Sequence, residues 1–304
     1  IKEYLVSKSV DCVVILGDRF EILAAALAAY FMKVPIVHLH GGERTLGAQD
    51  EAFRHCITKL SNLHFTANEE FRNRVIQMGE EPSTVFDVGA LGIDNISSFS
   101  TISRIELYSE LDLCDDLPFV LVSYHPETLS DRSPGDVADN ICNALFDFFG
   151  DSMQFVVIGP NMDPRFDTIL QTYKLYEQNN NFNFFESISS PIYLSAMQNC
   201  EFMIGNSSSA IIESTYLRTW AVNVGDRQAG RPYDENVINC GNEMLDLKNA
   251  LKKLSRLKKS RPVPHLNFIY GNAGAAKNIT RVIQQTDFKS LGLKSFFDIL
   301  TEVQ

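Results

Sequence analysis

Short apolar runs alternate with amphipathic stretches along most of the 304-residue chain. The apolar runs predict strands at Cys12–Leu16, Ile36–Leu39, His64–Thr66, Val85–Val88, Phe119–Ser123, Phe155–Ile158, Phe182–Phe185, Phe202–Ile204 and Ala221–Val224. The amphipathic stretches predict helices between them, among them Phe20–Phe31, Glu51–Leu60, Glu69–Met78, Asp136–Phe149 and Ser209–Tyr216. Because the strands are apolar almost throughout and alternate with helices, the pattern indicates parallel sheets covered on both faces, an α/β fold.

Two polar breaks interrupt this alternation. One is rich in serine and lies near Asn95–Ser103, and the other is acidic and lies at Asp112–Pro118. The alternation then starts again, which predicts a second doubly wound domain. We therefore expect a first domain at residues 1–103, a second at residues 104–287 and a C-terminal segment at residues 288–304.

Both ends of the chain have helical patterns. Ile1–Lys8 resembles the last turns of a helix that no strand and ligand-binding turn precede, so we expect the first domain to begin upstream. At the other end, Lys294–Leu300 predicts a short helix that packs back on the first domain.

Composition narrows the class of protein. Hydrophobic residues make up 45% of the chain and charged residues 21%, which is typical of a globular protein. No apolar run approaches the roughly 18 residues of a membrane span. The net charge of −11 argues against a nucleic-acid surface, although a few arginines and a helix N-terminus can bind a phosphate locally. The six cysteines are scattered without metal-ligand spacing, which favours reduced thiols in a cytoplasmic protein and no metal site.

The densest group of titratable residues follows the predicted strand Ile36–Leu39. It runs from His38 through His40, two glycines and Glu43 to Thr45, and continues in Asp50-Glu51-Ala-Phe-Arg54-His55. Open α/β sheets bind ligands at the carboxyl ends of their strands, so this cluster predicts a site. The alternative interpretation is a polar loop followed by a capped helix.

Two further strand ends carry similar candidates. Gly17-Asp18-Arg19 follows Cys12–Leu16, where Asp18 either belongs to the site or caps the next helix. His125 follows Phe119–Ser123, and Pro126 fixes the turn that directs it out of the strand end. A histidine in this position is either functional or a structural hydrogen-bonding residue.

The second half of the chain offers a phosphate-binding pattern. Gly205-Asn-Ser-Ser-Ser209 follows a strand and opens a predicted helix, where free amides and hydroxyls suit a diphosphate unless the serine is only an N-cap. Glu213 lies one turn further on, in a position to accept from ribose hydroxyls. The loop Gly225–Arg231 adds Arg227 and Arg231. Neither a GxxxxGK[ST] nor a GxGxxG motif occurs, which argues against a P-loop or conventional dinucleotide protein.

Taken together, these motifs resemble the UDP-N-acetylglucosamine 2-epimerases, in particular the hydrolysing branch of sialic-acid and related nonulosonic-acid synthesis. The resemblance covers nearly the whole chain and implies two Rossmann-like domains of the glycosyltransferase-B type, with the active site in the interdomain cleft. It implies UDP binding by Ser207, Ser208, Glu213 and Arg227. It also implies that the residues surrounding the sugar are Asp18, Glu43, Asp50, Glu51, Arg54 and His125. It further implies a homo-oligomer, either a dimer or a tetramer, that acts without a cofactor.

The implied reaction has two halves. A base removes the C2 proton while UDP leaves C1, giving a 2-acetamidoglucal, and water then adds with inversion at C2. Asp18, Asp50 and Glu51 are the candidate bases, because neighbouring carboxylates push their pKa values apart. Asp50 and Arg54 share one face of the predicted helix, and we expect that face to point into the cleft.

The chain departs from the family pattern in two respects. His40 stands where many relatives carry a glutamate. Glu43 or His40 is therefore expected to take over part of the catalytic role of that glutamate. The strand and Gly-Thr-Arg-type turn with which relatives begin are not present before Ile1.

Three points stay open at this stage. The sugar is either N-acetylglucosamine or a 2,4-diacetamido-trideoxy analogue. The first alternative function is a nonhydrolysing epimerase or a glycosyltransferase of the same fold. The second is an inactive fragment that only binds the nucleotide sugar.

Overall fold

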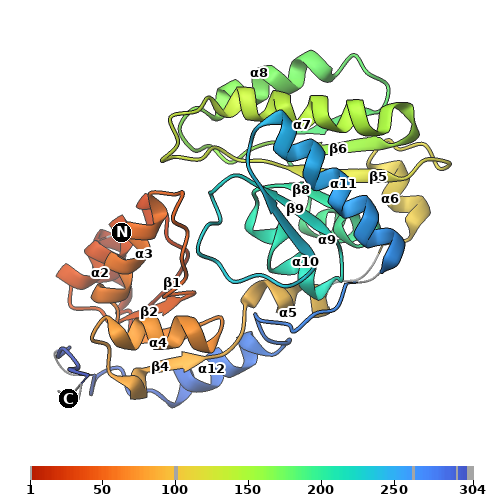
Figure 1. Cartoon of the computed structure of the whole chain (residues 1–304). Coiled ribbons are helices and arrows are strands. Elements are labelled where there is room, and N and C mark those ends of the chain that lie inside the picture. Colours follow the sequence, from red (N-terminus) through yellow and green to blue (C-terminus); the bar gives the residue numbers. More distant parts are fainter. Residues whose placement is uncertain (1, 99–101, 262–263, 292–293, 300–304) are drawn as a thin grey trace, which may run out of the picture. The chain divides into compact units, whose positions relative to one another are not determined.

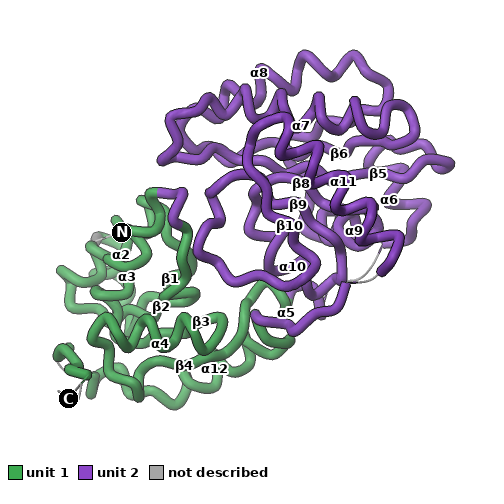
Figure 2. The backbone as a smooth tube through the Cα atoms, viewed as in Figure 1, with its two compact units in different colours: residues 1–45, 49–94, 270–304 green, residues 46–48, 95–269 purple. Residues whose placement is uncertain are grey.

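The computed structural model describes residues 2–98, 102–261, 264–291 and 294–299, and the chain divides into two compact units (Figure 2). Unit 1 comprises residues 1–45, 49–94 and 270–304, and unit 2 comprises residues 46–48 and 95–269. Unit 1 is therefore assembled from stretches that are far apart in the sequence.

Unit 1 is built on a four-stranded parallel sheet in the order β1-β2-β3-β4 (Figure 1). The strands are β1 (Val13–Leu16), β2 (Ile36–Leu39), β3 (Leu63–Thr66) and β4 (Val85–Asp87). The helices are α1 (Lys2–Lys8), α2 (Phe20–Phe31), α3 (Asp50–Leu60), α4 (Glu69–Gln77), the 3-10 helix η1 (Pro82–Thr84) and α12 (Ala275–Gln285). Helix α5 (Leu91–Ser98) begins in unit 1 and ends in unit 2.

Alternating side chains of β2 supply two different apolar clusters. Ile36 packs with Ala26 and Ala29 of α2 and Ile57 of α3. Its neighbour Val37 packs in the other cluster, together with Phe65 of β3 and Ile279 of α12. Successive residues of a strand point to opposite faces, so both faces of this sheet are covered.

Unit 2 is built on a six-stranded parallel sheet in the order β10-β9-β8-β5-β6-β7. The strands are β5 (Phe119–Ser123), β6 (Gln154–Ile158), β7 (Phe182–Phe185), β8 (Met203–Gly205), β9 (Ala221–Val224) and β10 (Val237–Cys240). The helical elements are α6 (Arg104–Glu110), α7 (Pro134–Phe149), η2 (Gly150–Ser152), α8 (Phe166–Tyr176), α9 (Ser190–Asn199), η3 (Ser208–Ala210), α10 (Glu213–Tyr216) and α11 (Met244–Ser260). Strands β5 and β6 are buried at every position, as expected of central parallel strands.

The predicted α/β class with parallel sheets is confirmed. Each predicted strand is present, with bounds that agree or differ by one residue at one or both ends. The sequence pattern did not reveal β10, because its last two residues, Asn239 and Cys240, are polar or only partly buried. The predicted helix Ser209–Tyr216 is interrupted, since η3 ends at Ala210 and α10 begins at Glu213.

The C-terminal segment differs from its prediction. The described part of the expected helix Lys294–Leu300, residues 294–299, is not helical, and Leu300 lies outside the described residues. Hydrogen bonds to the part of unit 1 that comes earlier in the sequence hold this segment instead. The Phe297 amide donates to the Gly79 carbonyl at 2.9 Å, and the Lys294 ammonium donates to the Ser61 carbonyl at 2.7 Å.

The domain boundaries expected at residues 103 and 287 remain predictions. In the structure, α12 belongs to the compact unit that contains β1–β4, whereas the sequence pattern predicts that residues 275–285 belong to the second domain. None of the helices in the described residues is long and apolar enough to cross a membrane.

Candidate functional sites

Arg54 is the centre of the polar cluster in unit 1. It projects from α3, and only 1% of its surface is exposed. Its guanidinium donates to the Glu51 carboxylate at 2.8 Å, to the Thr45 hydroxyl at 2.9 Å and to the Glu43 carbonyl at 3.0 Å. It also donates to the carboxylate of Asp18, which follows β1. A single buried cation therefore joins the segments that follow β1 and β2.

Glu51 is held in its ionised form. Burial opposes ionisation, but hydrogen bonds from His55 and from the Thr45 amide, together with the charge of Arg54, lower its pKa to about 2. The Thr45 amide lies 2.6 Å from this carboxylate and the His55 ring 3.2 Å from it. A carboxylate with such a low pKa is a weak base, so Glu51 is suited to positioning Arg54 and Thr45.

The two residues around the glycine turn form a second pair. His40 Nδ1 lies 2.7 Å from Glu43 Oε1, and His40 Nε2 accepts from the Leu91 amide at 3.2 Å. Since Nε2 accepts, the ring proton is on Nδ1 and is donated to Glu43. His40 has a φ of +65°, a left-handed conformation that turns the chain at the end of β2.

Asp50 is the first residue of α3 and is half-buried. Arg54 makes its ion pair along the helix with Glu51, three residues before it. The helix face that places the Arg54 guanidinium therefore also carries Glu51, in addition to the predicted Asp50.

In unit 2, His125 and Asn206 hold two strand ends together. The His125 amide donates to Asn206 Oδ1 at 2.7 Å, and Asn206 Nδ2 donates back to the His125 carbonyl at 2.9 Å. His125 follows β5 and Asn206 follows the neighbouring β8, whose last residue, Gly205, has a φ of +142°. A Cβ at Gly205 would lie 2.0 Å from the Ser123 carbonyl oxygen, so only glycine fits this close approach.

His125 is neutral at pH 7. Burial, and to a lesser extent the charge of Arg227, lower its pKa to about 3. Its Nδ1 accepts from the Asn161 amide at 3.0 Å, so the neutral ring carries its proton on Nε2. His125 therefore offers a hydrogen-bond donor without a charge.

The loop after β9 approaches the same strand ends. Gln228 Nε2 donates to the Asn206 carbonyl at 2.8 Å, and Arg227 donates to this carbonyl at 3.4 Å. Arg227 also lies 3.8 Å from the Asp163 carboxylate. The structure thus brings the predicted residues His125 and Arg227 together around Asn206.

The serines after β8 form a hydroxyl chain. Tyr193 OH lies 2.6 Å from Ser209 Oγ, which lies 2.8 Å from Ser207 Oγ. Ser208 begins η3, and Glu213 begins the short helix α10. The predicted serines are therefore close to Asn206 in sequence and space.

Several residues of the two clusters are not predicted by the sequence pattern. Asn206, Gln228, Asp163 and Tyr193 were not chosen as site residues, although Asn206 and Gln228 lie inside quoted motifs. Their partners lie on other segments, and Asn206 meets a residue 81 positions away. Within the described ranges, no three His, Cys, Asp or Glu side chains are grouped as metal ligands.

Two parallel α/β units with polar clusters after their strands define the class of the protein. They are two Rossmann-like units of the glycosyltransferase-B type, as in the solved UDP-GlcNAc 2-epimerase from Neisseria meningitidis. That structure has a TM-score of 0.80 and 19% identity, with 94% of this chain and 79% of the other covered. The family model for UDP-N-acetylglucosamine 2-epimerase matches residues 1–284. The chain belongs to this family.

Curated relatives agree with this assignment. The polysialic acid biosynthesis protein P7 of Escherichia coli is 37% identical over 300 residues, which cover 98% of this chain and 76% of the relative. The GDP/UDP-N,N'-diacetylbacillosamine 2-epimerase (hydrolyzing) of Campylobacter jejuni is 37% identical over 245 residues, which cover 80% of this chain and 63% of the relative.

Proposed function

We propose that the protein is a hydrolysing 2-epimerase. It converts UDP-N-acetylglucosamine, or a 2,4-diacetamido-trideoxy analogue, and water into the free 2-epimeric amino sugar and UDP. The observation that carries the proposal is the buried Arg54, which holds Asp18 and Glu51 after neighbouring strands of unit 1. Relatives from Campylobacter jejuni and Legionella pneumophila, 37% and 36% identical, are named as hydrolysing enzymes.

In this proposal, unit 2 binds UDP. Ser207, Ser208 and Glu213 contact the diphosphate and ribose, and Arg227 neutralises charge on the phosphates. The neutral His125 donates from Nε2 to the departing diphosphate. Negative charge grows on the β-phosphate as the C1–O bond breaks, so donors fixed in advance lower the barrier.

Unit 1 supplies the proton transfers. The C2 proton is weakly acidic, so its removal is coupled to the departure of UDP, and a carboxylate takes the proton as the 2-acetamidoglucal forms. We assign this base to Asp18 or Asp50, because the low pKa of Glu51 makes it the poorer acceptor. Water then adds its hydroxyl to C1, and the proton that water gives up passes to Glu43. Glu43, paired with His40, is the group proposed to deliver a proton to C2 on the opposite face.

The proposal is tested with Asp18→Asn and Asp50→Asn. In the unchanged protein we expect free UDP and a free amino sugar from UDP-N-acetylglucosamine or its analogue. At least one variant should lose roughly 100-fold or more of this turnover, the usual contribution of a positioned base, and should still bind UDP by calorimetry. Near-normal turnover in both variants would contradict the assignment.

Product analysis distinguishes the two epimerase types. The relative from Neisseria meningitidis, 31% identical over 82% of this chain, is named as a UDP-N-acetylglucosamine 2-epimerase without mention of hydrolysis. A nonhydrolysing enzyme would return a UDP-linked epimer and no free UDP. UDP binding without any turnover would instead support a nucleotide-sugar-binding role.

A further inference from the structure

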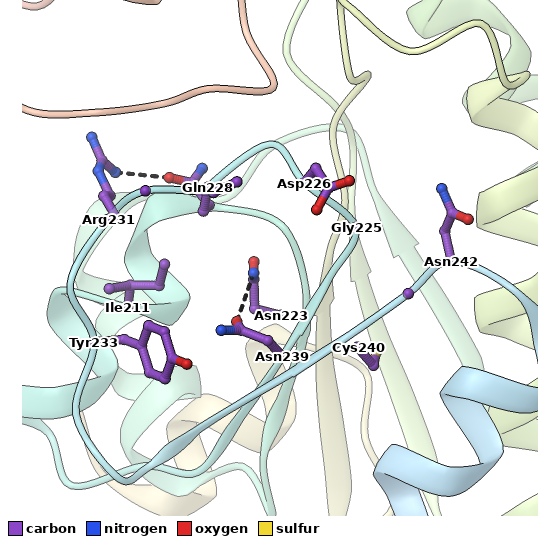
Figure 3. Close-up of a pocket in the computed structure, with 13 residues that line it drawn as sticks. Ile211, Asn223, Gly225, Asp226, Gln228, Arg231, Tyr233, Asn239, Cys240 and Asn242 are labelled. Carbon is purple, nitrogen blue, oxygen red and sulfur yellow. Dashed lines mark hydrogen bonds between the residues drawn. The ribbon is translucent and has the colours of Figure 1, made fainter.

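Unit 2 contains a pocket that the proposed reaction does not use. It lies at the carboxyl ends of β9 and β10, behind the loop that begins at Gly225, and has a volume of about 370 Å³ (Figure 3). This volume is within the roughly 300–1,000 Å³ of small-molecule sites. Arg231 lines the pocket, whereas Arg227, four residues before it, contacts Asn206 instead. The structure thus separates the two arginines of this loop.

Two asparagines form the polar wall of the pocket. Asn223 of β9 and Asn239 of β10 are register partners in the parallel sheet, and the Asn223 Nδ2 donates to the Asn239 Oδ1 at 2.9 Å (Figure 3). Only 4% of Asn223 is exposed, yet its Oδ1 has no hydrogen-bond partner among the described residues. One bond between two amides leaves one acceptor and one donor side by side, whichever way each amide is turned.

The charges around the pocket favour a neutral ligand. Asp226 and Arg231 both line it, so their formal charges cancel, and Arg231 donates to Gln228 Oε1 at 2.9 Å. Burial, together with the nearby charge of Asp246, raises the pKa of the Cys240 thiol to about 12, so this lining group is also uncharged at pH 7. A diphosphate would meet the Asp226 carboxylate without a surplus of positive charge.

An aromatic ring and an aliphatic side chain complete the lining. Tyr233 is 48% exposed and lines the pocket together with the amide pair and Ile211 (Figure 3). A pyranose offers the matching surfaces. Each of its neighbouring hydroxyls can both donate and accept, so two of them match the free donor and the free acceptor of the amide pair. Its C–H face can pack against the aromatic ring of Tyr233.

We propose that this pocket binds a free neutral monosaccharide, with two adjacent hydroxyls on the Asn223–Asn239 pair and the ring against Tyr233. The site is separate from the residues assigned to UDP, and the proposal does not depend on the proposed reaction. Because Gln228 lies between the pocket and Asn206, an occupied pocket contacts the loop that carries Arg227.

The test uses saturation-transfer NMR with D-glucose, N-acetyl-D-mannosamine and uridine as separate probes, each in the presence of excess UDP. We expect a sugar signal from the unchanged protein. The variant Asn239→Leu should lose at least tenfold in sugar affinity, because it removes one member of the pair from an exposed strand position. Tyr233→Ala should weaken binding as well. Gln171→Leu, which replaces an exposed amide on α8, is the matched control and should bind as the unchanged protein does.

Three results would overturn the proposal: no binding of either sugar, equal sugar binding by Asn239→Leu and the unchanged protein, or Asn239-dependent binding of uridine alone. The last result would assign the pocket to a nucleobase. Thermal unfolding of each variant shows that it is folded. UDP release from UDP-N-acetylglucosamine, measured on Asn239→Leu, tests the proposed reaction separately, since this residue takes no part in it.

Discussion

At the scale of single residues, the unit 1 cluster depends on one side chain. Arg54 is a fully buried cation whose bonds go to carboxylates and to polar groups of three separate segments. A buried charge is tolerated only when it is paired and hydrogen-bonded. Removing one partner leaves the other charge buried and unpaired, which costs the full desolvation free energy. The position of Asp18 is thus linked to the fold of α3.

We therefore expect Arg54→Met to lower the free energy of unfolding by about 3–5 kcal/mol, since it leaves Asp18 and Glu51 without their buried partner. Denaturant unfolding measures this change. Arg261→Met is the control, because Arg261 and its partner Glu235 are both exposed, and we expect a change within about 0.5 kcal/mol. Similar changes in the two variants would contradict the structural role of Arg54.

His125 gives a prediction about pH. Its pKa is lowered to about 3 in the folded protein, mainly by burial, from an ordinary value of 6.5. Between these values the unfolded chain binds a proton that the folded protein does not, so stability falls as the pH decreases from 6.5 towards 3. We expect His125→Gln to flatten this part of the dependence, measured as unfolding free energy from pH 7 to pH 4. His265→Gln, at an exposed position, should keep the original slope.

At the scale of elements, the loop after β9 begins with a positive-φ residue, which glycine permits and which the neighbouring side chains require. Gly225 has a φ of +75°, and a Cβ there would lie 1.9 Å from Glu127 Oε1. Glu127 is itself buried and accepts from the Asp226 amide at 3.1 Å, so it cannot move without losing that bond. The loop is therefore fixed against the segment after β5.

Gly225→Ala is expected to weaken UDP binding, because it displaces the loop that carries Arg227. It should also destabilise the protein by more than the cost of placing an alanine at positive φ, because the added Cβ clashes with Glu127. Gly150→Ala separates the two effects. Gly150 has a φ of +52° and a ψ of −132°, a strained conformation for other residues, but no atom within 4 Å of an added Cβ, so it should lose only about 1–3 kcal/mol. Calorimetric titration with UDP and denaturant unfolding measure both quantities. Equal losses of stability in both variants would exclude the steric role of Glu127.

The elements themselves were largely predictable from sequence, and their side-chain partners were not. Strands such as Phe119–Ser123 follow from a short continuous apolar run, the pattern of a strand that is buried on both faces. Strand β10 was not predicted because two of its four residues, Asn239 and Cys240, do not extend the apolar run. The cluster around Arg54 was found because its residues follow directly after the predicted strands β1 and β2, where the sequence places a site. The hydrogen-bonded pair of His125 and Asn206 was missed because the two residues follow different strands and lie 81 positions apart in the sequence.

At the scale of the whole molecule, unit 1 is discontinuous in sequence. Ile279 of α12 packs with Val37, Leu39, Leu63 and Phe65, which lie more than two hundred residues earlier. The pattern of the sequence restarts only once, after residue 118, and it predicted a return to the first domain only for Lys294–Leu300, not for α12. The packing of α12 on the first sheet depends on two complementary apolar surfaces. Periodicity shows that each surface is apolar but not which surface it contacts.

Ile279→Ala should accordingly destabilise unit 1. Truncation of a buried isoleucine removes apolar contact and leaves a cavity, with a typical loss of about 2–5 kcal/mol. Hydrogen exchange followed by mass spectrometry should show faster exchange in β2 and β3, with β5 and β6 nearly unchanged. Ile105→Ala, at an 80% exposed position, is the control. Equal acceleration in both sheets would mean that the two units unfold as one.

The pair of hydrogen bonds between Asn206 and His125 also affects the chemical ageing of the protein. An asparagine followed by a serine is prone to deamidation when its backbone is free to cyclise, and Ser207 follows Asn206. Several hydrogen bonds restrain this segment in the folded state. Two go through the Asn206 side-chain amide, Gln228 and Arg227 donate to its carbonyl, and its backbone amide donates to the Ser123 carbonyl. An aspartate at this position accepts from the His125 amide but cannot donate to its carbonyl. Molecules that have spent time unfolded would thus accumulate a one-dalton mass increase at this peptide.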